Sequence, residues 1–259
     1  MAKLIINESK LVMDHEKTRR KKQPWLITGC LILVTITVLF VAGFIIDRHS
    51  GTWALPISIS IFAGAICIIV GSSIGGEKFQ SDASGIQGEE QTRKILQRLP
   101  DSYTVISNVT LGLNQRGNEI DHLVLGDNGV FIVETKNYAG TLTGYIRDRE
   151  WTKTKTTGGG NKYEKEAQNP IPQIKKQTMN LKEILSEYGI RKRIESIVYF
   201  SNPDARFEVD GYDPNVQIFV EDEHGAEEML RYIQASTSAR LSEKEKQDII
   251  EILRERQNM

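Results

Sequence analysis

Cysteine is scarce in this chain: Cys30 and Cys67 are the two among 259 residues, and both lie inside long apolar runs. A disulfide framework or a cysteine-based zinc site therefore cannot be built in the polar part of the chain, which fits a reducing compartment. The sequence also lacks an internal repeat, a P-loop and a glycine-rich dinucleotide motif. The formal net charge of -1 at pH 7 by itself says nothing about nucleic-acid binding.

Two long apolar runs stand near the N-terminus, at residues 25–46 and 53–74. Each is uncharged and exceeds the roughly 20 residues that a membrane-spanning helix needs. The joining residues 47–52 predict a tight turn, so we expect a transmembrane helical hairpin. A cleaved signal peptide would have a shorter apolar core and a small-residue cleavage site. Two full-length runs in succession also disfavour a buried hairpin in a soluble protein.

The orientation of this hairpin follows from basic residues. Five of them precede the first run: Lys17, Arg19, Arg20, Lys21 and Lys22. The joining segment offers only Arg48, so the positive-inside rule predicts a cytoplasmic N-terminus. Two spans return the chain to the same side, and Trp25 and Trp53 fit interfacial anchors. The expected location is the cell membrane, multi-pass, with both termini cytoplasmic and the lipid bilayer as one partner.

Residues 119–136, EIDHLVLGDNGVFIVETK, predict two antiparallel strands joined at an Asn-Gly turn. A loop at Asn128-Gly129 places Asp121 opposite Lys136, and a loop at Asp127-Asn128 places it opposite Glu134. Both loops have an even length, so both bring Asp121, Glu134 and Lys136 to one face. A divalent-cation site and a partly buried ion pair are equally compatible with this pattern. His122 alternates to the other face and is expected to be packed.

Several ordered motifs extend this pattern along the chain. They are Gly88-Glu89, Glu119-Ile120-Asp121-His122, Glu134-Thr135-Lys136-Asn137-Tyr138, Gly140 to Gly144, Trp151, and Asn169-Pro170 with Gln173. Asp121 followed by Glu134-Thr135-Lys136 resembles the D…ExK core of the PD-(D/E)xK nuclease superfamily. Together the motifs resemble the nuclease-related domain, NERD, over roughly residues 85–220.

This resemblance implies an α/β fold with a restriction-endonuclease-like mixed sheet core flanked by helices, preceded here by the transmembrane hairpin. It implies Mg²⁺ or Mn²⁺ bound by Asp121, Glu134 and the carbonyl of Thr135. Glu89 would help to position metal or water, and Lys136 would orient the attacking water. Gln173 would be an auxiliary residue facing the site. A surface amide is the alternative for Gln173.

Helical periodicity bears on the choice between two neighbouring acids. Residues 86–99 predict an amphipathic helix whose buried face holds Ile95, Leu96 and Leu99. Glu89 falls at the border of that face and Glu90 falls opposite, so we expect Glu89 to point inward. A second helix is predicted from Asn169 to about Tyr188, with prolines at its start.

The remaining patterns complete an α/β domain. We expect strands at residues 103–111, 141–146, 150–154, 194–200 and 216–220, and helices at 223–233 and from Ser242 onward. Residues 152–162 predict a basic flexible loop, which is either solvated or follows a phosphate backbone. The expected parts are a basic cytoplasmic tail (1–23), two transmembrane helices (24–74), a linker (75–84), the nuclease-like domain (85–222) and C-terminal helices (223–259).

Two functions follow as hypotheses. The first is a membrane-anchored, metal-dependent nuclease that hydrolyses phosphodiester bonds of nucleic acid, with DNA as the expected substrate. The alternative is a catalytically silent nucleic-acid or protein binding module held at the membrane, because a fold alone does not determine function.

Overall fold

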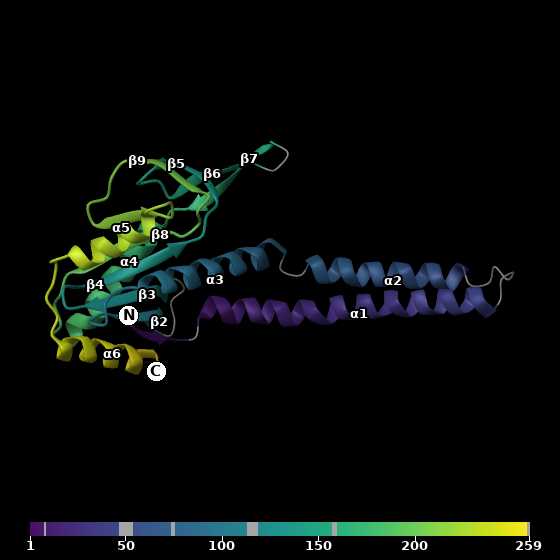
Figure 1. The fold of residues 1–259 in the computed structure, drawn as a ribbon, viewed down its shortest axis with the longest axis horizontal. Coiled ribbons are helices and arrows are strands. Elements are labelled where there is room, and N and C mark those ends of the chain that lie inside the picture. The colour runs from purple at the N-terminus through teal and green to yellow at the C-terminus, as the bar shows by residue number, and fades with distance from the viewer. Residues whose placement is uncertain (8, 47–53, 74–75, 113–118, 157–159, 258–259) are drawn as a thin grey trace. The chain divides into compact units, whose positions relative to one another are not determined.

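The computed structural model describes residues 1–7, 9–46, 54–73, 76–112, 119–156 and 160–257. The chain forms two compact units. Met1–Ser9 joins Gly85–Met259 in the larger unit, and Lys10–Ser84 forms the smaller one (Figure 1).

Two helices, α1 (Lys10–Ile46) and α2 (Ala54–Ser73), make up most of the smaller unit. They lie side by side and run in opposite directions (Figure 1). Glycine permits their close approach, since a Cβ added to Gly29 would lie 2.8 Å from Ile68 Cγ1. Small residues commonly allow such packing between helices in membranes.

The outer surface of this helix pair exposes large apolar side chains, among them Leu31, Val34, Val38, Leu39, Phe62, Ile66 and Ile69. One described helix, Leu11–Leu39, is long and apolar enough to cross a membrane, and only 11% of its most apolar stretch is buried. A signal sequence would pass the same test of length and composition. The predicted turn at residues 47–52 and the anchor Trp53 lie outside the described residues.

The predicted tail and linker contain regular structure. Residues 1–23 hold strand β1 (Lys3–Ile6) and the first turns of α1. Residues 76–84 belong to α3 (Gly76–Leu96) rather than to a linker. Within the smaller unit, Phe79 of this helix stacks on His15 of α1 with ring centroids 4.1 Å apart. Tertiary packing of this kind outweighs the weak helix propensity of a Gly/Ser-rich stretch.

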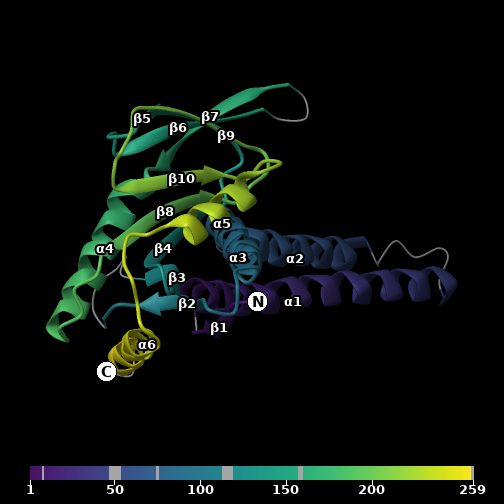
Figure 2. The same ribbon diagram turned by 60° about the vertical axis from the view of Figure 1, so that its left-hand side comes forward.

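A six-stranded mixed sheet forms the centre of the larger unit. Its order is β1-β2-β3-β4-β8-β10, and Figure 2 shows these strands side by side. The strands after β1 are β2 (Thr104–Thr110), β3 (Glu119–Gly126), β4 (Gly129–Lys136), β8 (Ile194–Phe200) and β10 (Val216–Val220). β2, β3 and β4 pair antiparallel, whereas β1, β8 and β10 are added in parallel.

The predicted central hairpin is confirmed. Gly126 pairs with Gly129 and His122 pairs with Val133, so the loop is Asp127-Asn128. Continued by one residue, this register places Asp121 opposite Glu134, which is the second of the two predicted arrangements.

Helices cover both faces of the sheet. On one face, α3 and α5 (Gly225–Ala235) pack through a core that includes Leu96, Leu99, Met229 and Ile233. On the other face, α4 (Pro170–Glu187) and α6 (Glu243–Gln257) pack through a core that includes Ile174, Leu181, Ile249 and Leu253. Residues 223–259 therefore belong to the same unit as the sheet and not to a separate one.

A second sheet of four strands, in the order β7-β6-β5-β9, extends the unit. Its strands are β5 (Gly140–Tyr145), β6 (Glu150–Thr156), β7 (Lys162–Gln168) and β9 (Ala205–Asp210). The prediction of a loop at residues 152–162 is wrong at both ends, because β6 continues to Thr156 and β7 begins at Lys162. The unpredicted strands β1, β7 and β9 all lie at sheet edges, where strands are commonly short or rich in charge. β9 nevertheless alternates, with Ala205, Phe207 and Val209 on one face.

Candidate active site

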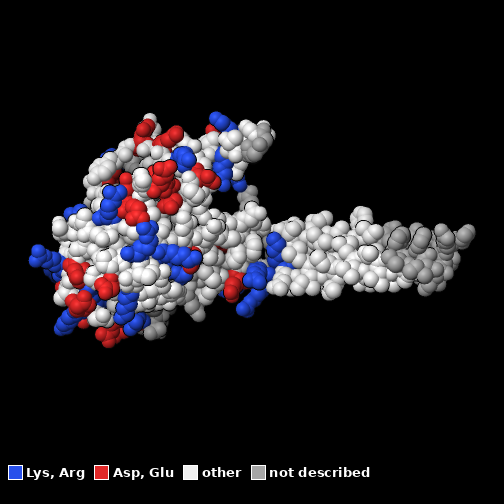
Figure 3. Space-filling model, viewed as in Figure 1, with Lys and Arg blue, Asp and Glu red and all other residues white. Residues whose placement is uncertain are grey.

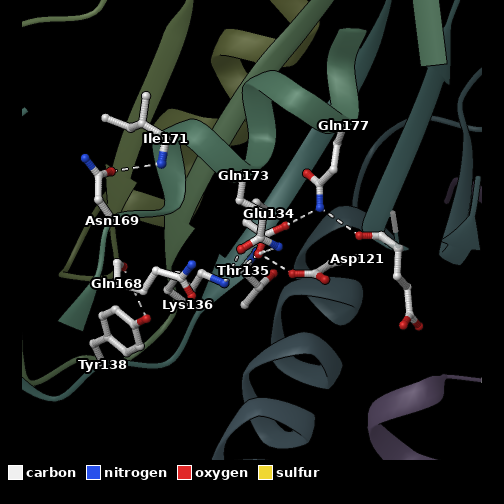
Figure 4. A network of polar contacts seen from close by, with 11 residues as sticks. Asp121, Glu134, Thr135, Lys136, Tyr138, Gln168, Asn169, Ile171, Gln173 and Gln177 are labelled. Carbon is white, nitrogen blue, oxygen red and sulfur yellow. Dashed lines mark hydrogen bonds and ion pairs between the residues drawn. The ribbon is translucent and has the colours of Figure 1, made fainter. Parts of the chain in front are cut away.

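The site lies where the β3–β4 pairing ends. Beyond the pair of His122 and Val133, the Thr135 amide donates a hydrogen bond to Asp121 Oδ2 at 2.8 Å. The Asp121 carboxylate thus satisfies the Thr135 amide at the point where the backbone pairing of the two strands ends. This contact holds Asp121 beside the Glu134-Thr135-Lys136 segment (Figure 4).

Three side chains donate hydrogen bonds to the Glu134 carboxylate, which is 1% exposed. Lys136 Nζ lies 2.6 Å from Oε1 and Gln173 Nε2 lies 2.7 Å from the same oxygen. Gln177 Nε2 lies 2.9 Å from Oε2. One charged donor and two amides together satisfy a buried carboxylate whose burial would otherwise be costly.

Helix α4 supplies two of these donors because its first turn is fixed. The Asn169 side chain caps the helix by accepting a hydrogen bond from the Ile171 amide at 2.9 Å. Its Nδ2 donates to the carbonyls of Ile146 and Asp148 at 3.0 and 2.6 Å. The Asn169-Pro170 pair therefore ties the start of α4 to the segment after β5, and Gln173 follows one turn later.

Gln177 is a site residue that the sequence analysis missed. Its side chain is fully buried and also donates to the Glu119 carbonyl at 2.7 Å. The available signal was its spacing, since residues four apart on a helix share a face and Gln173 was already a candidate.

Helix α3 approaches the other side of the site through Gly88. A Cβ at this position would lie 2.7 Å from Ser201 Oγ and 2.8 Å from Asn137 Cβ. A side chain larger than hydrogen would therefore push α3 away from the end of β4. The next residue, Glu89, interacts electrostatically with Glu119, Glu134 and Lys136. Glu90 instead pairs with Arg93 and lies 3.5 Å from Lys94 Nζ.

Burial and mutual repulsion raise the pKa values of two carboxyl groups here. Burial, followed by the charges of Glu119 and Glu134, raises the pKa of Glu89 from 4.5 to about 7. Burial, followed by the charges of Glu134 and Glu89, holds the pKa of Asp121 well above its usual value. The pKa of Lys136 is raised despite its burial, because Glu134 and Asp121 stabilise the ammonium group. The site thus holds more negative charge than its one lysine balances.

The oxygen ligands that these residues offer suit a hard divalent cation such as Mg²⁺. The donor set consists of carboxylate and carbonyl oxygens, and the buried Thr135 hydroxyl has no hydrogen-bond partner among the described residues. Within the described part of the chain, no three His, Cys, Asp or Glu side chains are grouped to hold a metal ion. Mg²⁺ usually takes only one or two protein carboxylates and keeps several waters, so Asp121 with Glu134 suffices. Glu134 accepts three hydrogen bonds, and a carboxylate has about four acceptor sites, so one remains for a cation.

His122 lies on the opposite face of β3, as its alternation predicts. It is 1% exposed, and its Nδ1 lies 2.9 Å from Ser107 Oγ. Burial, followed by the charge of Arg93, lowers the pKa of His122 to about 3. The ring is therefore neutral and packed.

A cavity of about 670 Å³ elsewhere in the larger unit is lined by residues of α4, β8 and β10, with Tyr232 of α5. Lys175, Thr178 and Lys182 line it from α4. None of the predicted site residues lines this cavity, so the carboxylate site is a separate feature.

Comparisons with known proteins agree with the motif pattern. An uncharacterized protein of Bacillus anthracis is 42% identical over 71 residues, which are 26% of this chain. The match spans only a third of that relative's length. No solved structure matches the chain. Residues 84–201, which contain Glu89, Asp121, Glu134, Lys136 and Gln173, match the family model described as the nuclease-related domain, NERD.

Proposed function

We propose that this protein is a metal-dependent nuclease anchored in the membrane. The observation that carries the proposal is the convergence of Asp121, Glu134 and Lys136 at the end of the β3–β4 hairpin, within a region similar to the nuclease-related domain. The reaction is hydrolysis of phosphodiester bonds in nucleic acid, with DNA as the expected substrate. The mixed sheet flanked by helices also fits the restriction-endonuclease-like fold that the family resemblance implies.

Asp121, Glu134 and the Thr135 carbonyl would hold Mg²⁺ or Mn²⁺. When bound, such an ion polarises a phosphoryl oxygen and lowers the pKa of a coordinated water. Its positive charge would also offset the repulsion between carboxylates, which helps to raise the pKa values of Glu89 and Asp121.

The chain's own residues have distinct tasks in this proposal. Lys136, held at 2.6 Å by Glu134 and at 3.2 Å by the Gln173 carbonyl oxygen, orients the attacking water and offsets charge on the scissile phosphate. Glu89 has a pKa of about 7, so it can accept or release a proton near neutral pH. Gln173 contacts both Glu134 and Lys136 and keeps them in place.

The membrane anchor in this proposal has two spans, α1 and α2. Strand β1 precedes the helix pair in the chain and β2 follows it, yet the two strands pair in parallel in one sheet. A hydrogen-bonded sheet outside the bilayer lies on one side of it, so the intervening residues must cross an even number of times. This pairing supports a second span that returns the chain.

The basic residues before Trp25 assign the sides. Lys17, Arg19, Arg20, Lys21 and Lys22 favour a cytoplasmic start of α1. β1, near the N-terminus, belongs to the sheet of the larger unit, so both termini would then be cytoplasmic. The site would face the cytoplasm as well.

Cleavage by the purified full chain in detergent micelles tests the proposal. DNA and RNA, each single- and double-stranded, would be incubated with Mg²⁺, with Mn²⁺ or with a chelator. We expect metal-dependent cleavage that is lost in Asp121→Ala. If no nucleic acid is cleaved and added metal leaves the melting temperature unchanged, the catalytically silent binding module replaces the nuclease.

A further inference from the structure

The ribbon formed by β6 and β7 carries different chemistry on its two faces. Side chains alternate along each strand, and the antiparallel register then decides which residues share a face. One face is basic and aromatic: Trp151, Lys153, Lys155, Tyr163, Lys165 and Ala167. The other is polar, with three acids and one lysine: Glu150, Thr152, Thr154, Thr156, Lys162, Glu164, Glu166 and Gln168. We call Lys153, Lys155, Lys165 and Tyr163 the basic face.

The basic face continues the side of the ribbon that packs against the domain. Trp151 and Ala167, at its inner end, are buried in the core beside α4. Farther along the ribbon, the same side carries the three lysines and Tyr163 of the basic face, and Tyr163 is 41% exposed. Basic side chains gather along this ribbon in Figure 3.

The basic face begins next to the candidate active site. Lys153 Nζ lies 5.0 Å from the centre of the Tyr138 ring, a cation–π contact. Tyr138 follows Lys136 by two residues and interacts electrostatically with Lys136 and Glu134 (Figure 4). A ligand on the basic face would therefore extend over Tyr138 to the site.

The register brings like charges together. Lys153 lies directly opposite Lys165, although Glu164 and Glu166 flank Lys165 on the same strand. Burial, followed by the charges of Lys155 and Lys165, lowers the pKa of Lys153. Like charges directly opposite one another destabilise a sheet. The register therefore concentrates positive charge on one face of the ribbon.

We propose that the basic face binds the sugar–phosphate backbone of the nucleic-acid substrate and leads it over Tyr138 to Lys136. Lys153, Lys155 and Lys165 contact phosphates, and the exposed ring of Tyr163 is available to stack on an unpaired base. This inference rests on the proposed nuclease function and names the surface that holds the substrate.

Salt-dependent binding tests the basic face without cleavage. All proteins would be full chains in detergent carrying Asp121→Ala, and the probes would be short labelled single- and double-stranded DNA. The test variant is Lys153→Gln with Lys155→Gln and Lys165→Gln. Each lost phosphate contact lowers the slope of log affinity against log salt by about 0.9 for duplex and about 0.7 for single strands. We therefore expect a slope smaller by roughly two to three, with no fall in melting temperature.

A charge-matched variant controls for the change in net charge. Lys94→Gln with Lys182→Gln and Lys244→Gln removes three exposed lysines away from the ribbon and should leave the slope unchanged. Equal slopes for the test variant and its parent, or no DNA binding by the parent, would overturn the inference. The inference would also be overturned if the test variant bound phosphatidylserine vesicles more weakly but bound DNA as its parent does. The basic face would then bind anionic lipid rather than nucleic acid. Cleavage by the chain with intact Asp121 reports separately on the proposed nuclease.

Discussion

Gln177 Nε2 donates to Glu134 Oε2 at 2.9 Å and to the Glu119 carbonyl at 2.7 Å, so one fully buried amide links the start of β3 to the end of β4. These contacts lie just beyond the last paired residues of the hairpin. The amide thus bridges the two strands where their own pairing has ended, and it holds the carboxylate that the proposed reaction needs.

Replacing Gln177 by leucine should therefore destabilise the larger unit. The buried Glu134 Oε2 and the partly buried Glu119 carbonyl lose their donor, and an unsatisfied buried group costs about 1–3 kcal/mol. Gln173→Leu is the matched control, because Glu134 Oε1 retains Lys136 and Gln173 is only partly buried. Urea unfolding of both variants would measure the difference. A larger loss for Gln173→Leu than for Gln177→Leu would contradict this account.

Gly88→Ala should impair both stability and cleavage. The new methyl group would meet Ser201 Oγ and Asn137 Cβ, and forcing such contacts costs about 1–3 kcal/mol. The displaced helix would also carry Glu89 away from the site. Gly76→Ala is the control in the same helix, since a Cβ there meets nothing within 4 Å. Melting temperatures and cleavage rates would test this, and equal effects of the two substitutions would refute it.

The metal-free protein should lose stability as pH rises from about 4.5 to about 7. The pKa of Glu89 is raised from 4.5 to about 7, so in this window the folded state binds more protons than the unfolded state. The contribution of Glu89 to stability then falls with rising pH by up to about 1.4 kcal/mol per unit and levels off above pH 7. Glu89→Gln removes this contribution. The melting temperatures of the two proteins should diverge through that window, and parallel curves would show that Glu89 titrates normally.

Lys136→Ala should separate catalysis from metal binding. Loss of one preorganised charge from a transition state typically slows a reaction about 100- to 1,000-fold. Metal-induced stabilisation should persist, because Asp121 and Glu134 remain. Asp121→Ala should abolish both properties, and Glu90→Ala should change neither, since Glu90 pairs with Arg93 outside the site. Cleavage by Lys136→Ala at the rate of the unaltered protein would exclude the proposed role of this lysine.

A reporter fused after Met259 should be cytoplasmic, whereas one inserted within residues 47–52 should be external. The first expectation follows from the basic residues before Trp25, and the second from the even number of crossings that the β1–β2 pairing requires. Protease protection in intact cells would measure both. Digestion of the larger unit by protease added outside the cell would show that the predicted orientation is wrong.

Elements with a clear apolar period were predictable. The strands Ile194–Phe200 and Val216–Val220 have the limits that their apolar runs predict. The helix start predicted at Ser242 is also confirmed, because α6 begins at Glu243 and the Glu245 amide donates to Ser242 Oγ at 3.2 Å. The edge strands β1 and β7 were not predicted, because the first has four residues and the second is mostly charged and exposed. β9 was also missed, although Ala205, Phe207 and Val209 alternate with polar residues.

The sequence by itself determined the two-residue turn, the proline-led start of α4 and the even spacing that brings Asp121, Glu134 and Lys136 together. Those features depend on backbone geometry and side-chain alternation, which act over a few residues. Tertiary structure decided the rest. It chose between the two possible loops, brought Gln177 to Glu134, and paired β1 with β2 across about a hundred residues of chain. It also converted a predicted loop into a ribbon with one basic face. Register and contacts between distant segments depend on how the whole core packs, and local periodicity does not contain that information.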